Sequence, residues 1–195
     1  ERINLTRDVH FYTNTTMDTL DYSGTGINSG SKVVFAAYGD KIRELTNQVP
    51  AVLNALQGFG DAHLAMPGVV CISAPAYTNA PEAAEQMNAL DAQLSGATLE
   101  GLAIIVVCDD ANFTAASLNN YLWVTYTRSN PSHDIYGIGS FTQNKHWGCA
   151  GPLVIDARIK PHHAPVLIKD EAVEKHVDRL FEKGGSLYSL ISTQV

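Results

Sequence analysis

Residues 102–108 (LAIIVVC) constrain the fold of this chain more than any other segment. Seven consecutive apolar residues, several of them β-branched, are typical of a strand that is covered on both faces of its sheet. The run is too short to cross a bilayer, which takes about 20 apolar residues. It ends at Asp109 and Asp110, which predict either a binding site or, more commonly, caps of a loop or of the next helix.

The segment before this strand predicts an amphipathic helix over residues 79–96. Asn79 is suited to cap its first turn, because Pro81 follows within that turn and Glu82 comes three residues after the cap. Gly96 is suited to end the helix. The apolar side chains that recur at helical spacing, and that we expect to face the core, are Ala83, Met87, Leu90 and Leu94.

Strand and helix patterns alternate along the rest of the chain. Predicted strands cover residues 31–38, 69–72 and 152–157, and predicted helices cover residues 40–58, 114–127 and 170–183. We expect the first of these helices to be kinked or divided at Pro50. In the other two, the side chains expected to face inward are Leu118, Leu122, Trp123, Val173, Val177 and Leu180. Residues 128–151 lack this periodicity and predict a long irregular loop, a kind of segment that often carries function.

Alternating strands and helices predict an α/β fold, a layered domain with a mixed β-sheet flanked by helices. The 195 residues are enough for one substantial core. Residues 1–30, rich in Thr, Asn, Asp and Gly, predict an extended N-terminal arm with one short strand near Val9 and Phe11. We therefore expect an arm over residues 1–30 and a single α/β domain over residues 31–195.

Charge and cysteine content exclude several classes of protein. A net charge of −7 argues against a nucleic-acid surface, because phosphate recognition needs clustered Lys and Arg. Three cysteines do not make a disulfide framework, so we expect a reducing compartment and hence the cytoplasm. The chain begins at Glu1 without the pattern of a signal peptide, which favours a fragment or a processed product.

On residue type alone, His146 is the first candidate for chemistry. It lies between Lys145 and Trp147, so that a proton donor or acceptor stands beside a cation and an aromatic plane, a combination suited to an anionic aromatic ligand. The alternative is an exposed loop histidine without such a role. A metal site shared with Cys149 is conceivable, but a single His-x-x-Cys pair is a weak signal for zinc, and we expect no metal site in this chain.

Two further basic residues are candidates for binding an anion. Arg128 is suited to hold a carboxylate or phosphate through two parallel hydrogen bonds, or else to pin the predicted loop through an ion pair with Asp134. Lys160, in the segment DARIKPHH, has the same two interpretations. Residue type does not decide between the binding role and the structural role of either side chain.

Several motifs, taken in order along the chain, resemble the C-terminal portion of the UbiD family of decarboxylases. They are TMDTLDY, VVCDDANF, NNYLWVTYTRSNPSHDIYGIG, KHWGCAGPLVIDARIKPHHAP and KGGSLYSLI. The resemblance extends over nearly the whole chain and is carried most specifically by residues 119–165. It is greatest to the branch that acts on hydroxylated benzoates, such as the 4-hydroxybenzoate, protocatechuate and gallate decarboxylases.

The resemblance implies reversible, non-oxidative removal of CO2 from an aromatic or α,β-unsaturated acid with prenylated FMN, a divalent metal such as manganese, and potassium. In the family, the acid/base residues and the metal ligands lie in an upstream flavin-binding region that has no counterpart in this chain. This portion is expected to supply a wall of the substrate pocket and much of a homo-oligomer interface. The resemblance implies that His146 orients the hydroxylated ring. The pocket would also include Lys145, Trp147 and Arg128, and Lys160 would contact the flavin.

Three functional hypotheses follow. The first is the substrate-pocket and oligomerisation part of such a decarboxylase, inactive unless the flavin-binding region is supplied by another polypeptide segment. The second is a non-catalytic assembly or regulatory subunit that retains the fold. It is favoured by Pro152, which stands where many family members have a lysine that reaches the flavin. The third is a small-molecule binding module that uses a cleft beside His146.

Overall fold

The computed structural model describes residues 3–16, 25–164 and 168–192. It divides into two compact units, Glu1–His163 and Ala164–Val195. The first unit contains every described strand, and the second contains the helices α5 (Glu171–Phe181) and α6 (Tyr188–Ser192). Among the described residues, no helix has the length and apolar character needed to span a membrane.

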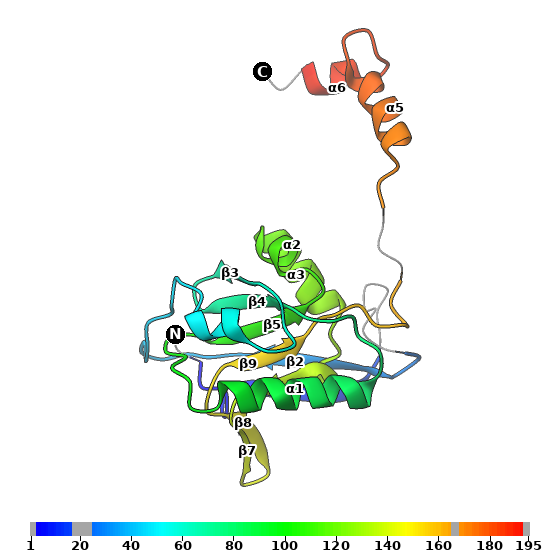
Figure 1. The fold of residues 1–195 in the computed structure, drawn as a ribbon. Coiled ribbons are helices and arrows are strands. Elements are labelled where there is room, and N and C mark those ends of the chain that lie inside the picture. The colour runs from blue at the N-terminus through cyan, green and yellow to red at the C-terminus, as the bar shows by residue number, and fades with distance from the viewer. Residues whose placement is uncertain (1–2, 17–24, 165–167, 193–195) are drawn as a thin grey trace. The chain divides into compact units, whose positions relative to one another are not determined.

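A five-stranded mixed sheet forms the centre of the first unit (Figure 1). Its strands, in spatial order, are β3 (Ala62–Met66), β4 (Val69–Ser73), β5 (Ile104–Cys108), β9 (Leu153–Asp156) and β6 (Ile135–Gly137). The three central strands are parallel, and the two outer strands are antiparallel to their neighbours. The predicted central strand is therefore confirmed as β5, and the predicted α/β fold with a mixed sheet and flanking helices is confirmed as well.

Helix α1 (Ala80–Leu94) covers one face of the sheet. The Asn79 side chain accepts a hydrogen bond from the backbone N–H of Glu82 at 3.0 Å, which confirms the predicted cap. The side chains predicted to face the core are all buried, and three of them join the sheet residues of one large hydrophobic cluster. That cluster includes Val70, Ile72, Ile105, Val107 and Val154, which alternate along three strands and therefore share one face.

The opposite face of the sheet is covered by α2 (Ala111–Ala115) and α3 (Leu118–Thr127). Tyr121 and Val124 of α3 pack with Cys71 and Val106 of the sheet. The predicted inward orientation of Leu118, Leu122 and Trp123 is wrong, because these side chains are 59%, 44% and 60% exposed. A single helix was expected over residues 114–127. Instead, Asp110 caps α2 and Ser117 caps a separate α3, which sets a different face of the second helix toward the sheet.

The predicted arm contributes an antiparallel ribbon made of β1 (Val9–Thr15) and β2 (Gly30–Phe35). The Ser31 hydroxyl hydrogen-bonds the Asn130 side chain and accepts a hydrogen bond from the backbone N–H of Ser132, so that the ribbon is fastened to α4 (Pro131–Asp134). The ribbon also joins both sides of the predicted boundary between residues 30 and 31. That boundary stays a prediction.

The predicted helix over residues 40–58 is wrong. Only Ala51–Ala55 is helical, as the short 3-10 helix η1, and the preceding segment is irregular. The backbone N–H of Thr46 donates to the carbonyl of Gly101 at 2.9 Å, and its carbonyl accepts from the N–H of Gly68 at 2.8 Å. These bonds to distant segments use the backbone groups that a helix would need, so tertiary contacts override the local apolar spacing.

The long irregular loop predicted for residues 128–151 is also wrong. This stretch contains α4, the edge strand β6, and a separate hairpin made of β7 (Ser140–Gln143) and β8 (His146–Cys149). The Asn130 side chain caps α4. This helix has only four residues and is followed directly by β6, so it is too short to show a helical pattern of apolar residues. The stretch predicted as a loop therefore contains one short helix and three short strands.

The second unit contains the predicted C-terminal helix, α5. The Asp170 carboxylate caps it by accepting hydrogen bonds from the N–H groups of Ala172 and Val173 at 2.8 and 3.2 Å. The predicted inward orientation of its apolar side chains is not observed, because α5 has no buried residue and Val173 and Val177 are 57% and 41% exposed.

Candidate functional site

A cavity of about 570 Å³ lies beside the carboxyl ends of the parallel strands, where ligands commonly bind in sheets of this kind. The segments that follow β4 and β9 supply Tyr77 and Lys160, and α1 supplies alanines of its first turns. The remaining wall comes from α4, β6 and the N-terminal arm. The titratable or aromatic side chains that line the cavity are Tyr77, His133, Asp134, Tyr136, Lys160 and His162.

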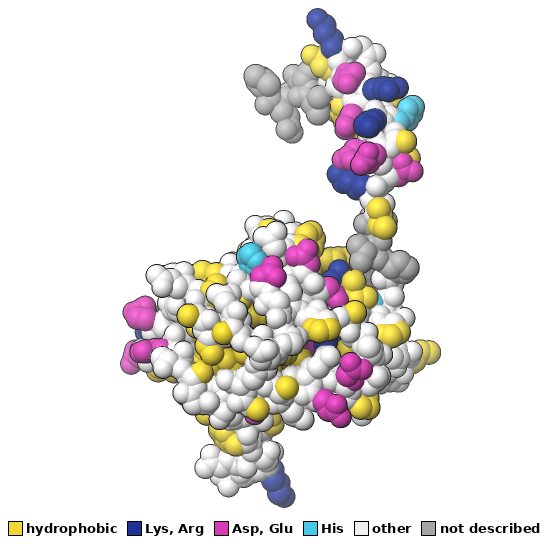
Figure 2. Space-filling view, viewed as in Figure 1, with side chains coloured by type: hydrophobic (Ala, Val, Ile, Leu, Met, Phe, Trp, Pro, Cys, Tyr) yellow, Lys and Arg dark blue, Asp and Glu magenta, His cyan; other side chains and the backbone are white. Residues whose placement is uncertain are grey.

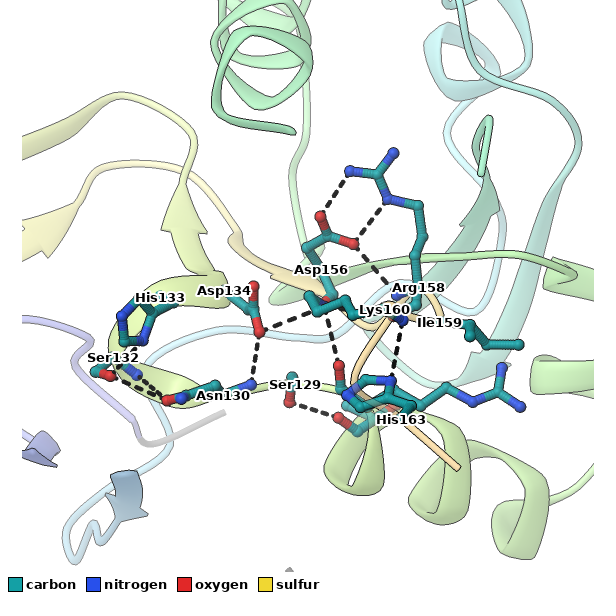
Figure 3. A network of polar contacts seen from close by, with 12 residues as sticks. Ser129, Asn130, Ser132, His133, Asp134, Asp156, Arg158, Ile159, Lys160 and His163 are labelled. Atoms are coloured by element: carbon teal, nitrogen blue, oxygen red, sulfur yellow. Dashed lines mark hydrogen bonds and ion pairs between the residues drawn. The ribbon is translucent and has the colours of Figure 1, made fainter. Parts of the chain in front are cut away.

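Lys160 is the buried cation of this cavity, with its side chain 4% exposed. Its ammonium donates to the backbone carbonyls of Arg128 at 2.9 Å, Asp156 at 3.0 Å and Arg158 at 3.3 Å. The Asp134 carboxylate lies 3.3 Å from the same nitrogen. Figure 3 shows the lysine between Asp134 and the segment that follows β9. These contacts tie the ends of α3 and β9 to α4.

A second buried ion pair lies beside the first. The Arg158 guanidinium donates to both carboxylate oxygens of Asp156, at 2.9 and 2.7 Å, and both side chains are almost fully buried. Arg158 also donates to the carbonyl of Pro75 at 2.9 Å and to the amide oxygen of Gln86 at 2.5 Å. The guanidinium carbon lies 5.7 Å from the centre of the Tyr77 ring, and the Lys160 nitrogen lies 5.4 Å from it. The tyrosine ring is therefore held by two cations.

The charges of the two ion pairs, one in the wall of the cavity and one beside it, are balanced. Two carboxylates, Asp134 and Asp156, face two cations, and burial raises the pKa of Asp134 although the Lys160 ammonium opposes that rise. Burial, together with these carboxylates, raises the pKa of Tyr77 and raises that of Tyr136 to about 12. Both phenols are thus protonated at neutral pH and able to donate hydrogen bonds. A balanced, aromatic-walled cavity with such donors suits a small planar molecule with hydroxyl or carbonyl groups.

Arg128 lies at the edge of this network, at the end of α3. Its guanidinium is 3.3 Å from the carboxylate of Asp109, which also accepts the backbone N–H of Ile159 at 2.9 Å. Arg128 was predicted, as its structural alternative, to form an ion pair with Asp134. It does form an ion pair, but with Asp109, because Asp134 pairs with Lys160. Asp110 caps α2, so the two acidic residues after β5 have structural contacts in this chain.

His163 gives this region a pH dependence. Burial, aided by nearby positive charge, lowers its pKa to about 4, and its Nδ1 atom accepts the backbone N–H of Lys160 at 3.1 Å. An unfolded histidine titrates near 6.5. Between these values the unfolded chain binds a proton that the folded chain does not, so we expect the free energy of unfolding to decrease as the pH falls from about 6.5 toward 4.

Urea unfolding at pH 7 and pH 4.5 measures this effect. Asparagine at position 163 keeps a hydrogen-bond acceptor and removes the titrating group, so the His163→Asn variant is expected to lose less stability than the wild type between the two pH values. An equal loss in the two proteins would contradict the assignment.

The three residues around His146 lie elsewhere, on the β7–β8 hairpin. Asn144 and Lys145 form its turn with positive φ angles of 50° and 68°, and His146, exposed, is the first residue of β8. Trp147 is half-buried and meets Phe11 of the ribbon edge-to-face, with ring centres 5.8 Å apart. A second cavity, of about 920 Å³, lies near residues 94–102. Neither cavity has a residue of the 145–147 segment in its lining.

The structure thus places the predicted site residues in two groups. Arg128 and Lys160 belong to the buried network, whereas Lys145, His146 and Trp147 belong to the hairpin. All three N–H groups of the Lys160 ammonium have acceptors within this chain, so a contact with flavin stays a prediction. Across the described ranges, no group of three or more His, Cys, Asp or Glu side chains converges in a way that could hold a metal ion.

Most of the cavity and the buried ion pair beside it were not identified from the sequence. Tyr77, Tyr136, Asp156 and Arg158 were not singled out, although Asp156 and Arg158 carried a signal. They are charged residues at and just after the end of an apolar strand, and such charges are buried only when they are paired. No comparable local signal marks Tyr77 or Tyr136.

Comparisons with known proteins agree with the motifs. Residues 1–37 match the UbiD_C model, described as the 3-octaprenyl-4-hydroxybenzoate carboxy-lyase C-terminal domain. A 4-hydroxybenzoate decarboxylase subunit from Chlamydia pneumoniae is 27% identical over 177 residues, which are 91% of this chain and 28% of that protein. Uncharacterized proteins of Chlamydia muridarum and Chlamydia trachomatis serovar D are 28% and 29% identical, over 94% and 91% of this chain and 30% and 29% of their own lengths.

Among solved structures, an evolved dimeric form of the UbiD-class enzyme HmfF from Pelotomaculum thermopropionicum, in complex with prFMN, matches with a TM-score of 0.42 and 20% identity. The match covers 65% of this chain and 28% of that one. The chain spans less than a third of the length of the curated relatives that it matches. The family match at residues 1–37 and the alignment of nine-tenths of the sequence with a decarboxylase subunit show that this chain is similar to the C-terminal part of UbiD-type proteins.

Proposed function

We propose that this chain is the C-terminal, substrate-pocket and oligomerisation part of a UbiD-type decarboxylase that acts reversibly and without oxidation on a hydroxylated aromatic acid. One observation carries the proposal. The chain aligns over 91% of its length with a relative named as a 4-hydroxybenzoate decarboxylase subunit, and this alignment covers 28% of that relative. The catalytic machinery is therefore assigned to polypeptide beyond this segment.

In this proposal, His146 orients the substrate. Its place on an exposed hairpin supports the idea, because a side chain there is open to a ligand held by another polypeptide segment. The imidazole would hydrogen-bond a ring hydroxyl, with Lys145 attracting the carboxylate and Trp147 bordering the ring. Arg128 and Lys160 have structural contacts with Asp109 and Asp134, and a contact of either with substrate or flavin stays a prediction.

The two buried cations beside the cavity do not suit the phosphate end of a flavin. Lys160 and Arg158 are fully paired with Asp134 and Asp156, so neither is free to neutralise a phosphate. Prenylated FMN supplies the covalent chemistry in this proposal, and its binding, with manganese and potassium, is assigned to the upstream region. We further propose a cytoplasmic homo-oligomer in which that region is a partner of this chain.

Release of CO2 tests the proposal. The protein that contains this chain, assembled with the flavin-binding region and prenylated FMN, is expected to release labelled CO2 from carboxyl-labelled 4-hydroxybenzoate or protocatechuate. It is also expected to exchange labelled bicarbonate into the carboxyl group of the acid, because the reaction is reversible. Absence of both release and exchange with every hydroxylated benzoate, in an assembly that retains its flavin, would overturn the assignment.

The His146→Ala variant tests the role of the hairpin. Because misplacing a substrate can reduce the rate by about 10²-fold, we expect a loss of that order in kcat/KM. Gln143→Ala, which changes the residue paired with His146 across the hairpin, is the matched control and should retain activity. Unchanged turnover in His146→Ala would favour the alternative function, an assembly or regulatory subunit, which the naming of the relative as one part of a decarboxylase also fits.

A further inference from the structure

The cavity beside the carboxyl ends of the parallel strands has no part in the proposed reaction. None of residues 145–147, which orient the substrate in that proposal, lies in its lining. Its volume of about 570 Å³ falls within the ~300–1,000 Å³ of typical small-molecule sites. We call it the tyrosine cavity, after Tyr77 and Tyr136 in its wall. It is large enough to bind a small ligand.

Small side chains of α1 leave this space open. Ala80, Ala83 and Ala84, from the first turns of the helix, line one side of the tyrosine cavity. Ala80 and Ala84 are four residues apart, so they lie on the same side of the helix. Because Ala84 lines the cavity and is only half-buried, a larger side chain at this position would extend into it.

Two phenol hydroxyls are the unused hydrogen-bonding groups of the tyrosine cavity. Among the described residues, neither the Tyr77 hydroxyl nor the Tyr136 hydroxyl has a hydrogen-bond partner. Burial, followed by the nearby Asp134 carboxylate, raises the pKa of Tyr136 to about 12, so this phenol is protonated at neutral pH. A protonated phenol can both donate and accept a hydrogen bond. The cavity therefore offers groups that recognise a hydroxyl.

The charges in the lining favour a neutral occupant. In the described part of the lining, the side chains of Asp, Glu, Lys or Arg type are Asp134 and Lys160, which pair at 3.3 Å (Figure 3). Backbone carbonyls accept the three N–H groups of the lysine, so a carboxylate that entered would find no unpaired cation. The net charge of −7 also repels anions, and Figure 2 shows acidic side chains scattered over the surface of the first unit.

We propose that the tyrosine cavity binds a small neutral phenol, whose hydroxyl is hydrogen-bonded to Tyr136 and whose ring packs between Tyr77 and the alanines of α1. The Tyr77 ring is suited to this contact because Arg158 and Lys160 hold it in place, at 5.7 and 5.4 Å from its centre. Removal of CO2 from a hydroxybenzoate leaves a phenol. The identity of the occupant as the product class therefore rests on the proposed function, whereas the binding itself does not.

Photolabelling with 4-azidophenol tests the proposal. This neutral phenol becomes reactive on illumination, and it is added at pH 7 to the intact protein that contains this chain. Mass spectrometry of the peptides is expected to find modification within residues 77–84 and 133–136, which line the tyrosine cavity. Phenol should compete with this modification at least about 10-fold better than benzoate, an anion with the same ring, because the lining has no free cation.

Substitutions in the wall assign the modification to the cavity. Ala84→Leu fills the space and is expected to remove most of the modification. Ala89→Leu makes the same change at an exposed alanine of α1 outside the lining, and it should be modified like the wild type. Tyr136→Phe keeps the ring and removes the hydroxyl, so phenol should compete about 5-fold less well, the usual effect of one hydrogen bond.

Circular dichroism checks that each variant is folded, and Tyr136→Phe decides the outcome if Ala84→Leu does not fold. Modification confined to other peptides, or equal competition by phenol and benzoate, would overturn the proposal. Unchanged modification in a folded Ala84→Leu variant would also overturn it. Release of CO2 is measured separately, so a failure of the proposed function leaves these results unaffected.

Discussion

Replacing Arg158 by Met is expected to lower the free energy of unfolding by about 3–5 kcal/mol, the usual cost of removing one partner from a buried ion pair. The methionine fills part of the space but leaves the Asp156 carboxylate without its two charge-assisted hydrogen bonds. The carbonyl of Pro75 and the amide of Gln86 lose a donor as well. Urea unfolding at pH 7, followed by the circular dichroism of the first unit, measures the loss.

A double-mutant cycle separates the lost pair from lost packing. Arg158→Met combined with Asp156→Asn removes the uncompensated charge, while asparagine can still accept the backbone N–H of Arg158 that Asp156 accepts at 3.2 Å. We expect the double variant to be more stable than Arg158→Met alone. Lys41→Met, in an ion pair whose two side chains are 52% and 83% exposed, removes a cation at the surface and should have a much smaller effect. Equal losses at the two positions would contradict a buried role for Arg158.

The sequence predicts this fold best where a local pattern and the final burial coincide. The apolar run of β5 predicts a central strand, and it is one, because both of its faces are covered by apolar clusters. Helix α1 has a cap, a stop and one apolar stripe, and all three agree with its position on the sheet. In such segments, sequence spacing alone determines which side chains are buried.

Prediction fails where two apolar sides of one helix could each face the sheet, and where hydrogen bonds to distant segments determine the backbone conformation. Helix α3 is apolar on both sides, so its periodicity does not say whether Leu122 or Tyr121 faces the sheet. The segment before η1 has helical spacing, but its backbone bonds to Gly68 and Gly101. Apolar periodicity indicates which side chains share a face of a helix, but it does not indicate whether the sheet covers that face.

The candidate site was the least predictable part. Tyr77, Asp134 and Lys160 come from three segments that meet only because β4, β9 and α4 end at the same edge of the sheet. Each residue alone is an ordinary tyrosine, aspartate or lysine. By contrast, the motif around His146 was noticeable because its residues are consecutive, yet the structure leaves it on an exposed hairpin. Three consecutive candidate residues are easy to recognise in a sequence, but being consecutive does not place them in the wall of a cavity.

Replacing Lys160 by Met is expected to destabilise the chain by about 3–5 kcal/mol at pH 7, because the Asp134 carboxylate stays buried without its cation. Three backbone carbonyls, those of Arg128, Asp156 and Arg158, lose a donor at the same time. Urea unfolding measures the loss. Lys41→Met, at a lysine that is 52% exposed, is the control and should show no comparable change.

The pH dependence of the Lys160→Met variant identifies Asp134 as the cause. Burial already raises the pKa of Asp134, and removing the Lys160 ammonium takes away the charge that opposes the rise. The folded variant then binds a proton more readily than the unfolded chain, so the destabilisation relative to wild type should shrink as the pH falls from 7 toward 5. Asp134→Asn in the same background should remove this pH dependence. A destabilisation that is constant between pH 7 and 5 would attribute the effect to the lost carbonyl contacts instead of the carboxylate.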